Sequence, residues 1–286
     1  MNYISKIFVI VLSSIFAVLA KPVLKLTADK TQYLVYQPVY LKIERVNEPS
    51  AGEPRFIALE YQDIVLEITY PNKEKGQYKP PMQVCMGLDA EFQKIAYSTL
   101  ILSEGKIVTS QPGSFSIRLL DLNGNQVSPA SHFSVSLPKT VEDRKALDLI
   151  NSNPQSFAWF IYLEGGDHIP NGMDITQRLA GTNSSYAGFS QSVLALNFSE
   201  VAYDFTKNKI KRDRDFEKVR ALFLVGSEES NGEYLQLRVC ESMVKNFDKK
   251  NYPKEWHSRI RAVKNKYNSD LVRSDILTKI NTLYPD

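Results

Sequence analysis

Cysteine, histidine and glycine are all scarce in this chain of 286 residues, which has two, three and 13 of them respectively. Two cysteines, Cys85 and Cys240, cannot form a disulfide scaffold in a chain this long. Their apolar neighbours instead favour two separately buried thiols. No histidine lies in a His-Glu-x-x-His pair or at metal-ligand spacing from a cysteine. Neither a phosphate-binding glycine loop nor a Gly-x-Ser-x-Gly elbow occurs. We therefore expect no metal, no cofactor and no catalytic residue.

Long hydrophobic runs are also missing, apart from one near the start. Lys6 precedes the uncharged run 7–20, which is shorter than the roughly 20 residues that span a bilayer. Val18-Leu19-Ala20 fits the −3 and −1 positions of a cleavage site. The pattern predicts a signal peptide, residues 1–20, cleaved after Ala20, and an uncleaved membrane anchor is the alternative. The mature chain is then expected to be periplasmic or secreted, and to meet the membrane only through the transient signal peptide.

Residues 21–138 contain around eight short runs in which apolar and polar side chains alternate. In the clearest run, Phe115, Ile117 and Leu119 alternate with polar residues, and Asn123-Gly124 follows as a turn. Period-two alternation predicts strands with one buried face. Frequent turn signals between such strands favour an antiparallel β-sandwich. Pro138 ends the pattern, so we place a border between two domains, 21–138 and 139–286.

One stretch of the first domain, residues 71–94, shows no strand pattern and is predicted to be a long polar loop. Its polar part, residues 73–81, carries Tyr78 and three lysines, of which Lys79 is one. Long loops are often functional, so Tyr78 and Lys79 are candidate contact residues. An ordinary exposed loop is the alternative.

Two motifs in this region carry a resemblance to a known family. The segment Leu26-Thr27-Ala28-Asp29-Lys30-Thr31-Gln32-Tyr33, followed by Gln37-Pro38-Val39, resembles the opening of bacterial immunoglobulin-like domains, Leu-x-x-Asp-Lys-x-x-Tyr and then Gly-Glu-Pro-Val. Gln111-Pro112-Gly113-Ser114-Phe115-Ser116-Ile117-Arg118 is similar to their penultimate strand, with Phe115 in place of the usual Tyr. The resemblance covers residues 24–138 and implies an immunoglobulin-like sandwich. Such domains serve as binding modules, spacers and inhibitors, so it implies no single function.

Helical spacing replaces the β pattern after Pro138. Thr140 can cap the first helix, and the strongest apolar stripe runs from Tyr186 to Phe205. Its start resembles a tetratricopeptide-type hairpin, although the period of about 34 residues is missing. Short polar turns between such helices predict a stack of helical hairpins. The expected fold class is α+β with segregated domains: an N-terminal immunoglobulin-like antiparallel β-sandwich and a C-terminal all-α helical-hairpin domain.

Two polar segments of the second domain bear on function. Glu164, Asp167 and His168 lie close together in the predicted loop 162–174, where they could perform general acid–base chemistry or bind a cation. A turn that uses Asp, Gly and Asn for their backbone preferences is the alternative. Residues 207–220 hold seven basic and three acidic side chains. Such a run could contact an acidic partner, lipid headgroups or nucleic acid, but we interpret it as a solvated helix face.

These patterns together predict an exported, non-enzymatic binding or scaffold protein. Both predicted architectures present recognition surfaces, and the expected partner is a protein or an envelope polymer, not nucleic acid. One alternative is a hydrolase of an extracellular polymer that uses Glu164, Asp167 and His168. Another is a secreted protease inhibitor that uses an exposed loop such as 71–81.

Overall fold

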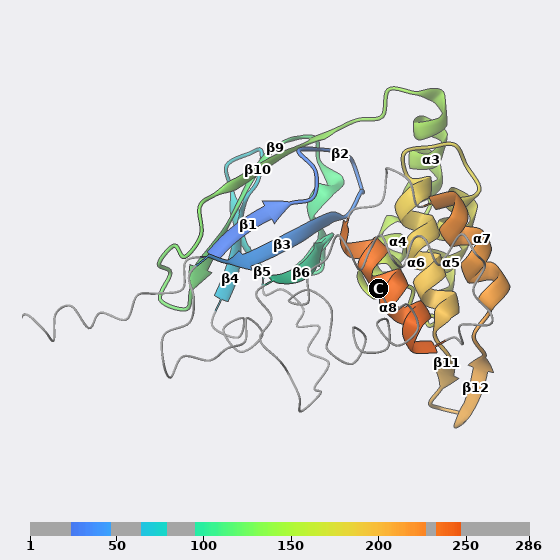
Figure 1. Cartoon of the computed structure of the whole chain (residues 1–286). Coiled ribbons are helices and arrows are strands. Elements are labelled where there is room, and N and C mark those ends of the chain that lie inside the picture. Colours follow the sequence, from blue (N-terminus) through green and yellow to red (C-terminus); the bar gives the residue numbers. More distant parts are fainter. Residues whose placement is uncertain (1–23, 47–63, 79–94, 227–232, 247–286) are drawn as a thin grey trace, which may run out of the picture.

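The computed structural model describes residues 24–46, 64–78, 95–226 and 233–246 (Figure 1). The predicted signal peptide, Lys79 and Cys85 lie outside these ranges, and the side chain of Cys240 is also outside the description. Among the described residues, no helix has the length and hydropathy needed to span a bilayer.

Two sheets form the first part of the molecule and enclose one hydrophobic core. The larger sheet has the order β2 (Gln32–Leu34), β10 (Ser131–Ser136), β9 (Gly113–Asp121), β4 (Ile64–Thr69) and β5 (Lys75–Tyr78). The smaller sheet has the order β1 (Leu24–Ala28), β3 (Val39–Arg45) and β6 (Ile95–Leu100). Leu41 and Ile43 of β3 share a buried cluster with Phe115 and Ile117 of β9. The predicted alternation in β9 is confirmed, because its apolar residues face this core.

Two expectations about the sheets are wrong. The strands were expected to pair antiparallel throughout, but β2 runs parallel to β10, with Gln32 opposite Ser134. The stretch 71–94 was expected to be a polar loop, but Lys75–Tyr78 forms β5, which pairs antiparallel with β4. In that pairing, Tyr78 lies opposite Leu66 and is only 6% exposed. A single apolar residue in a polar segment gave no periodic signal of this strand.

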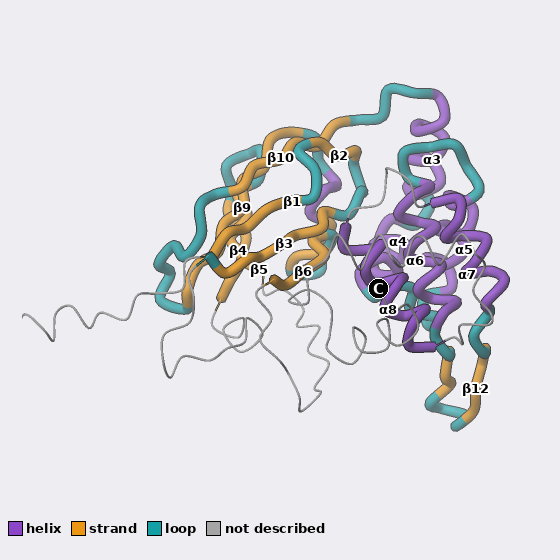
Figure 2. The backbone as a smooth tube through the Cα atoms, viewed as in Figure 1, coloured by secondary structure: helices purple, strands orange, loops and turns teal. Residues whose placement is uncertain are grey.

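The helices of the described residues lie at one end of the sheets (Figures 1 and 2). They are α3 (Val141–Asn151), α4 (Pro154–Tyr162), α5 (Pro170–Ala180), α6 (Ala187–Ser199), α7 (Phe216–Gly226) and α8 (Glu233–Asn246). Thr140 caps α3 as expected, because its hydroxyl accepts a hydrogen bond from the Asp143 amide at 3.0 Å. All 13 residues of α6 are buried, so α6 forms the centre of the helical part.

The prediction of a segregated, all-α C-terminal domain is wrong, and the fold is mixed α/β. Between α6 and α7 the chain forms an antiparallel hairpin of β11 (Ala202–Asp204) and β12 (Lys209–Arg212). Short strands β7 (Leu102–Ser103) and β8 (Lys106–Ile107) and the 3-10 turn η2 (Val108–Ser110) precede β9. One hydrophobic cluster joins Tyr40 and Ile101, from the sheet side, to Phe157 and Tyr186 from the helices. The helices are therefore not separate, because they bury apolar side chains that the sheets leave uncovered.

Candidate functional site

Tyr78, the first of the sequence-predicted contact residues, is a core side chain. Its hydroxyl donates to the Thr99 carbonyl at 3.1 Å. Burial, together with the neighbouring Tyr162, raises the pKa of Tyr78 above its usual value. This placement leaves Tyr78 little surface for a partner, whether as a contact residue or in a protease-inhibiting loop.

The other three predicted residues lie in the turn that follows α4. Glu164 and Gly165 both have positive φ angles, +51° and +94°. A Cβ atom at Gly165 would lie 2.5 Å from the Cβ of Asn197, so both the conformation and the close approach require glycine here. The turn thereby places Glu164 and Asp167 beside the C-terminal end of α6.

Each of these two carboxylates has an arginine partner from a distant part of the chain. Glu164 Oε2 accepts a hydrogen bond from Arg238 Nη2 of α8 at 2.9 Å. Asp167 Oδ1 accepts one from Asn197 Nδ2 of α6 at 2.7 Å and lies 3.4 Å from Arg212 Nη2 of β12. The side chains of Glu164 and Asp167 are 15% and 17% exposed. Both carboxylates therefore stabilise the packing of the turn against α6, β12 and α8.

Arg212 belongs to this cluster of side chains, and the sequence interpretation missed it. It was counted in a solvated helix face, but it lies in β12, with its guanidinium 5.0 Å from the ring centroid of Phe198. Its Nη2 also donates to the Asn197 carbonyl at 2.8 Å. No local motif identifies Arg212, because its partners lie 15 and 45 residues earlier in the chain.

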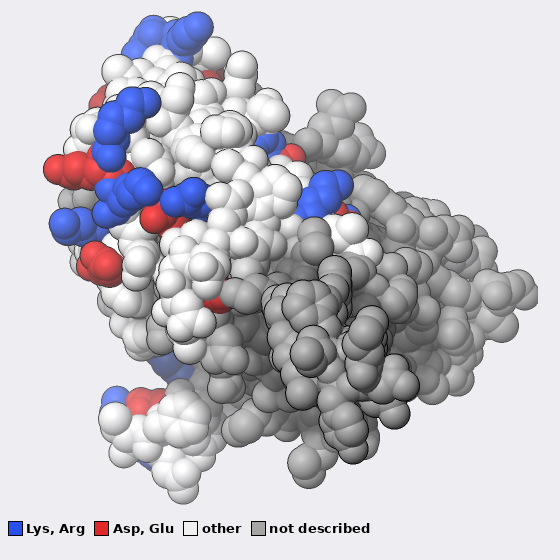
Figure 3. All heavy atoms as spheres, turned by 90° about the vertical axis from the view of Figure 1, so that its left-hand side faces the viewer, with Lys and Arg blue, Asp and Glu red and all other residues white. Residues whose placement is uncertain are grey.

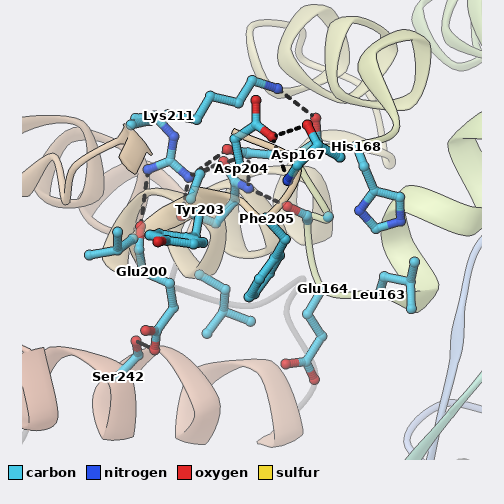
Figure 4. Close-up of a pocket in the computed structure, with 18 of the residues that line it drawn as sticks. Leu163, Glu164, Asp167, His168, Glu200, Tyr203, Asp204, Phe205, Lys211 and Ser242 are labelled. Carbon is cyan, nitrogen blue, oxygen red and sulfur yellow. Dashed lines mark hydrogen bonds and ion pairs between the residues drawn. The ribbon is translucent and has the colours of Figure 1, made fainter. Parts of the chain in front are cut away.

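A pocket of about 840 Å³ opens between this turn, the β11–β12 hairpin and α8 (Figure 4). The hairpin contributes Tyr203 and Phe205, which are 40% and 86% exposed, with ring centroids 5.0 Å apart. The opposite wall contains Glu200, whose Oε1 accepts hydrogen bonds from Ser242 Oγ at 3.0 Å and Asn246 Nδ2 at 2.9 Å. The pocket thus combines exposed aromatic rings with oriented polar groups.

The tip of the hairpin is fixed by a network around Asp204. Its Oδ1 accepts hydrogen bonds from the Thr206 hydroxyl at 2.6 Å and from the amides of Thr206 and Lys207. The bond from the Thr206 hydroxyl is the largest of the causes that lower the pKa of Asp204. Because Phe205 lies inside this turn, its backbone is held while its side chain remains exposed.

Charge of one sign does not gather on the face of the molecule shown in Figure 3. Basic and acidic side chains lie interspersed on the part of that face that the structure describes. Among the described residues, no group of three or more His, Cys, Asp or Glu is arranged to hold a metal ion. The pocket is therefore the candidate functional site of the described residues.

Comparison with known proteins identifies no family. No family model and no curated protein matches the chain. A solved structure of a polysaccharide lyase is 8% identical with a TM-score of 0.24, and the match covers 93% of this chain and 47% of that one. A β-1,2-glucanase from Parabacteroides distasonis is 11% identical with a TM-score of 0.20, and the match covers 92% and 33%. The chain spans less than half the length of either protein, and likeness this weak carries no argument about function.

Proposed function

We propose that this chain is an exported, non-enzymatic binding protein of the cell envelope or the extracellular space. It recognises a macromolecular partner at the pocket bordered by the turn 163–168, the β11–β12 hairpin and α8. The observation that carries the proposal is the pair of solvent-exposed rings, Tyr203 and Phe205, at the edge of an open pocket. Exposed apolar groups beside a cavity are typical of interaction sites.

The state of the acid–base candidates also supports binding over hydrolysis. Glu164 and Asp167 each pair with an arginine, so both carboxylates stabilise the packing of the turn. A residue that performs acid–base catalysis must reach the substrate, whereas these two carboxylates are directed at arginine side chains within the wall. The hydrolase alternative therefore has less support from this geometry than the binding proposal.

The experiment compares the mature chain, residues 21–286, with the double variant Tyr203→Ala/Phe205→Ala. Both proteins are immobilised and exposed to the native envelope fraction, and the retained material is identified and quantified. We expect a partner that the mature chain retains and the double variant loses. Leu122→Ala is the matched control, because Leu122 is 59% exposed and does not line the pocket. This variant should retain the partner.

Equal retention by all three proteins would contradict the proposal. A polymer-degrading activity that disappears in His168→Ala would also contradict it and would favour the hydrolase. Circular dichroism of each variant shows whether a loss of binding is caused by the missing side chain or by unfolding of the protein.

A further inference from the structure

The two aromatic rings border the cavity and are exposed to solvent, Tyr203 to 40% and Phe205 to 86%. Figure 4 shows Tyr203 and Phe205 on the hairpin side of the pocket, with Glu164, Glu200 and Ser242 on the side toward α8. The rings meet edge to face, at an interplanar angle of 66°. The Tyr203 hydroxyl donates to Asn208 Oδ1 at 2.5 Å, which holds its ring in place. A ligand in the pocket would thus meet aromatic faces on one side and oxygen atoms on the other.

The charges that line the pocket nearly balance. The lining includes the carboxylates Glu164, Asp167, Glu200 and Asp204 and the basic side chains Lys207, Lys211, Arg212, Arg238 and Lys245. Several of them pair within the wall: Glu164 with Arg238, Asp167 with Arg212, and Asp204 with Lys207. A surface whose charges pair internally exerts little attraction on a strongly charged ligand. The pocket therefore suits a ligand that is polar but carries no net charge.

We infer that the pocket binds a segment of a neutral polysaccharide. A pyranose ring has a flat face of C–H groups, which packs on an aromatic ring, and hydroxyl groups at its edge, which donate to carboxylates and accept from hydroxyls and guanidinium groups. Phe205 and Tyr203 supply the apolar surface. Glu200 supplies a carboxylate acceptor on the opposite side, where Ser242 and Asn246 donate to its Oε1 and orient it. The volume of about 840 Å³ lies within the range of about 300–1,000 Å³ for small-molecule pockets, which accommodates a short stretch of the chain.

This inference rests on the proposed function and names the class of partner. The test is affinity electrophoresis of the mature chain, residues 21–286, in gels that contain one polysaccharide each. The neutral probes are laminarin, dextran, arabinoxylan, galactomannan and glycol chitin, and the acidic probes are polygalacturonate and alginate. We expect at least one neutral probe to retard the protein, with little dependence on salt, because counter-ions do not compete for an uncharged ligand.

Three variants of the pocket and one control variant distinguish the stacking contact from a general loss of structure. Phe205→Ala should weaken the binding about tenfold, which corresponds to roughly 1.4 kcal/mol. Phe205→Tyr retains an aromatic ring and should bind as the parent does. Glu200→Gln exchanges the carboxylate for a neutral amide of similar size and should weaken the binding, whereas Leu122→Ala should leave it unchanged.

The outcomes separate this inference from the proposed function. If none of the neutral probes retards the protein, or if Phe205→Ala is retarded as strongly as the parent, the inference is wrong. Retardation by the acidic probes alone, abolished by salt, would also overturn it. If a protein from the envelope fraction binds through Tyr203 and Phe205 and no polysaccharide does, the proposed function stands and only the glycan inference fails.

Discussion

The hydroxyl of Tyr186 joins the helices to the sheets and offers a direct test of the shared core. Tyr186 is fully buried, and its hydroxyl donates to the Val35 carbonyl at 2.9 Å. Tyr186→Phe keeps the ring and removes only this donor. The Val35 carbonyl then lies buried without that hydrogen bond, and a buried group left unpaired costs about 1–3 kcal/mol. We expect the free energy of unfolding to fall by about 2 kcal/mol.

A matched control is available in the same chain. The Tyr203 hydroxyl also makes a hydrogen bond, to Asn208 Oδ1, but Tyr203 is 40% exposed. Water can replace that partner, so Tyr203→Phe should change the free energy of unfolding by less than about 0.5 kcal/mol. The contrast between the two variants measures the effect of burial on one and the same chemical change.

Urea unfolding at neutral pH provides the measurement, followed by far-ultraviolet circular dichroism and by tryptophan fluorescence. A core shared by helices and sheets predicts coincident transitions by the two probes. Tyr186→Phe should lower the midpoint without changing the slope. The reasoning is refuted if Tyr186→Phe and Tyr203→Phe have equal effects, or if the helices unfold in a separate transition that the Tyr186 variant alone shifts.

Three further predictions follow from other features of the chain. Burial raises the pKa values of Tyr33 and Tyr186 above the usual value for tyrosine. The stability that they contribute is therefore complete below about pH 10 and falls as the pH rises further, because the unfolded chain releases these protons first. Urea unfolding between pH 8 and 11.5 should show this decline, and Tyr186→Phe should make it shallower; an unchanged slope would contradict the assignment. A Cβ at Gly172 would lie 2.3 Å from the Ser156 carbonyl oxygen, so Gly172→Ala should destabilise the protein by about 1–3 kcal/mol, measured by urea unfolding. Gly181→Ala, whose Cβ would meet its nearest neighbour at 3.7 Å, should have little effect by comparison. Intact-mass measurement of exported material should show a chain that begins at Lys21, and a mass that includes residues 1–20 would favour a retained anchor.

The strands with one buried face were predictable, but their pairing was not. Alternation in β9 indicates which side chains face the core, because a strand has a period of two. It contains no information about the neighbouring strand or its direction. The three-residue strand β2 therefore gave no sign that it would lie parallel to β10, about a hundred residues later in the chain.

The C-terminal end of α6 shows why the helical stripe was misleading. The apolar spacing from Tyr186 to Phe205 predicted one long helix, but α6 ends at Ser199, and Glu200 has an extended backbone with φ −109° and ψ 156°. A helix buried on all sides has no polar face to mark its limits. Phe205 continued the spacing by coincidence, so no sequence pattern indicated the hairpin that forms one side of the pocket.

Only some residues of the candidate site could be predicted from the sequence. Glu164 and Asp167 were found because they lie close together in one polar turn. Their partners Arg238 and Arg212 lie 74 and 45 residues further along the chain, and each occurs among many other basic residues. Only the packing of α8 and β12 against the turn identifies which cations are involved.

The parallel pairing of β2 with β10 also governs the order in which the chain can fold. The contact between Ser134 and Thr31 closes a loop of 103 residues, and long-range contacts of this kind slow folding because a large loop must be ordered first. As the chain is synthesised from its N-terminus, β2 must remain unpaired at this edge until Ser136 is available. The edge of the five-stranded sheet is thus made by one of the earliest strands, yet it is among the last parts of that sheet to form.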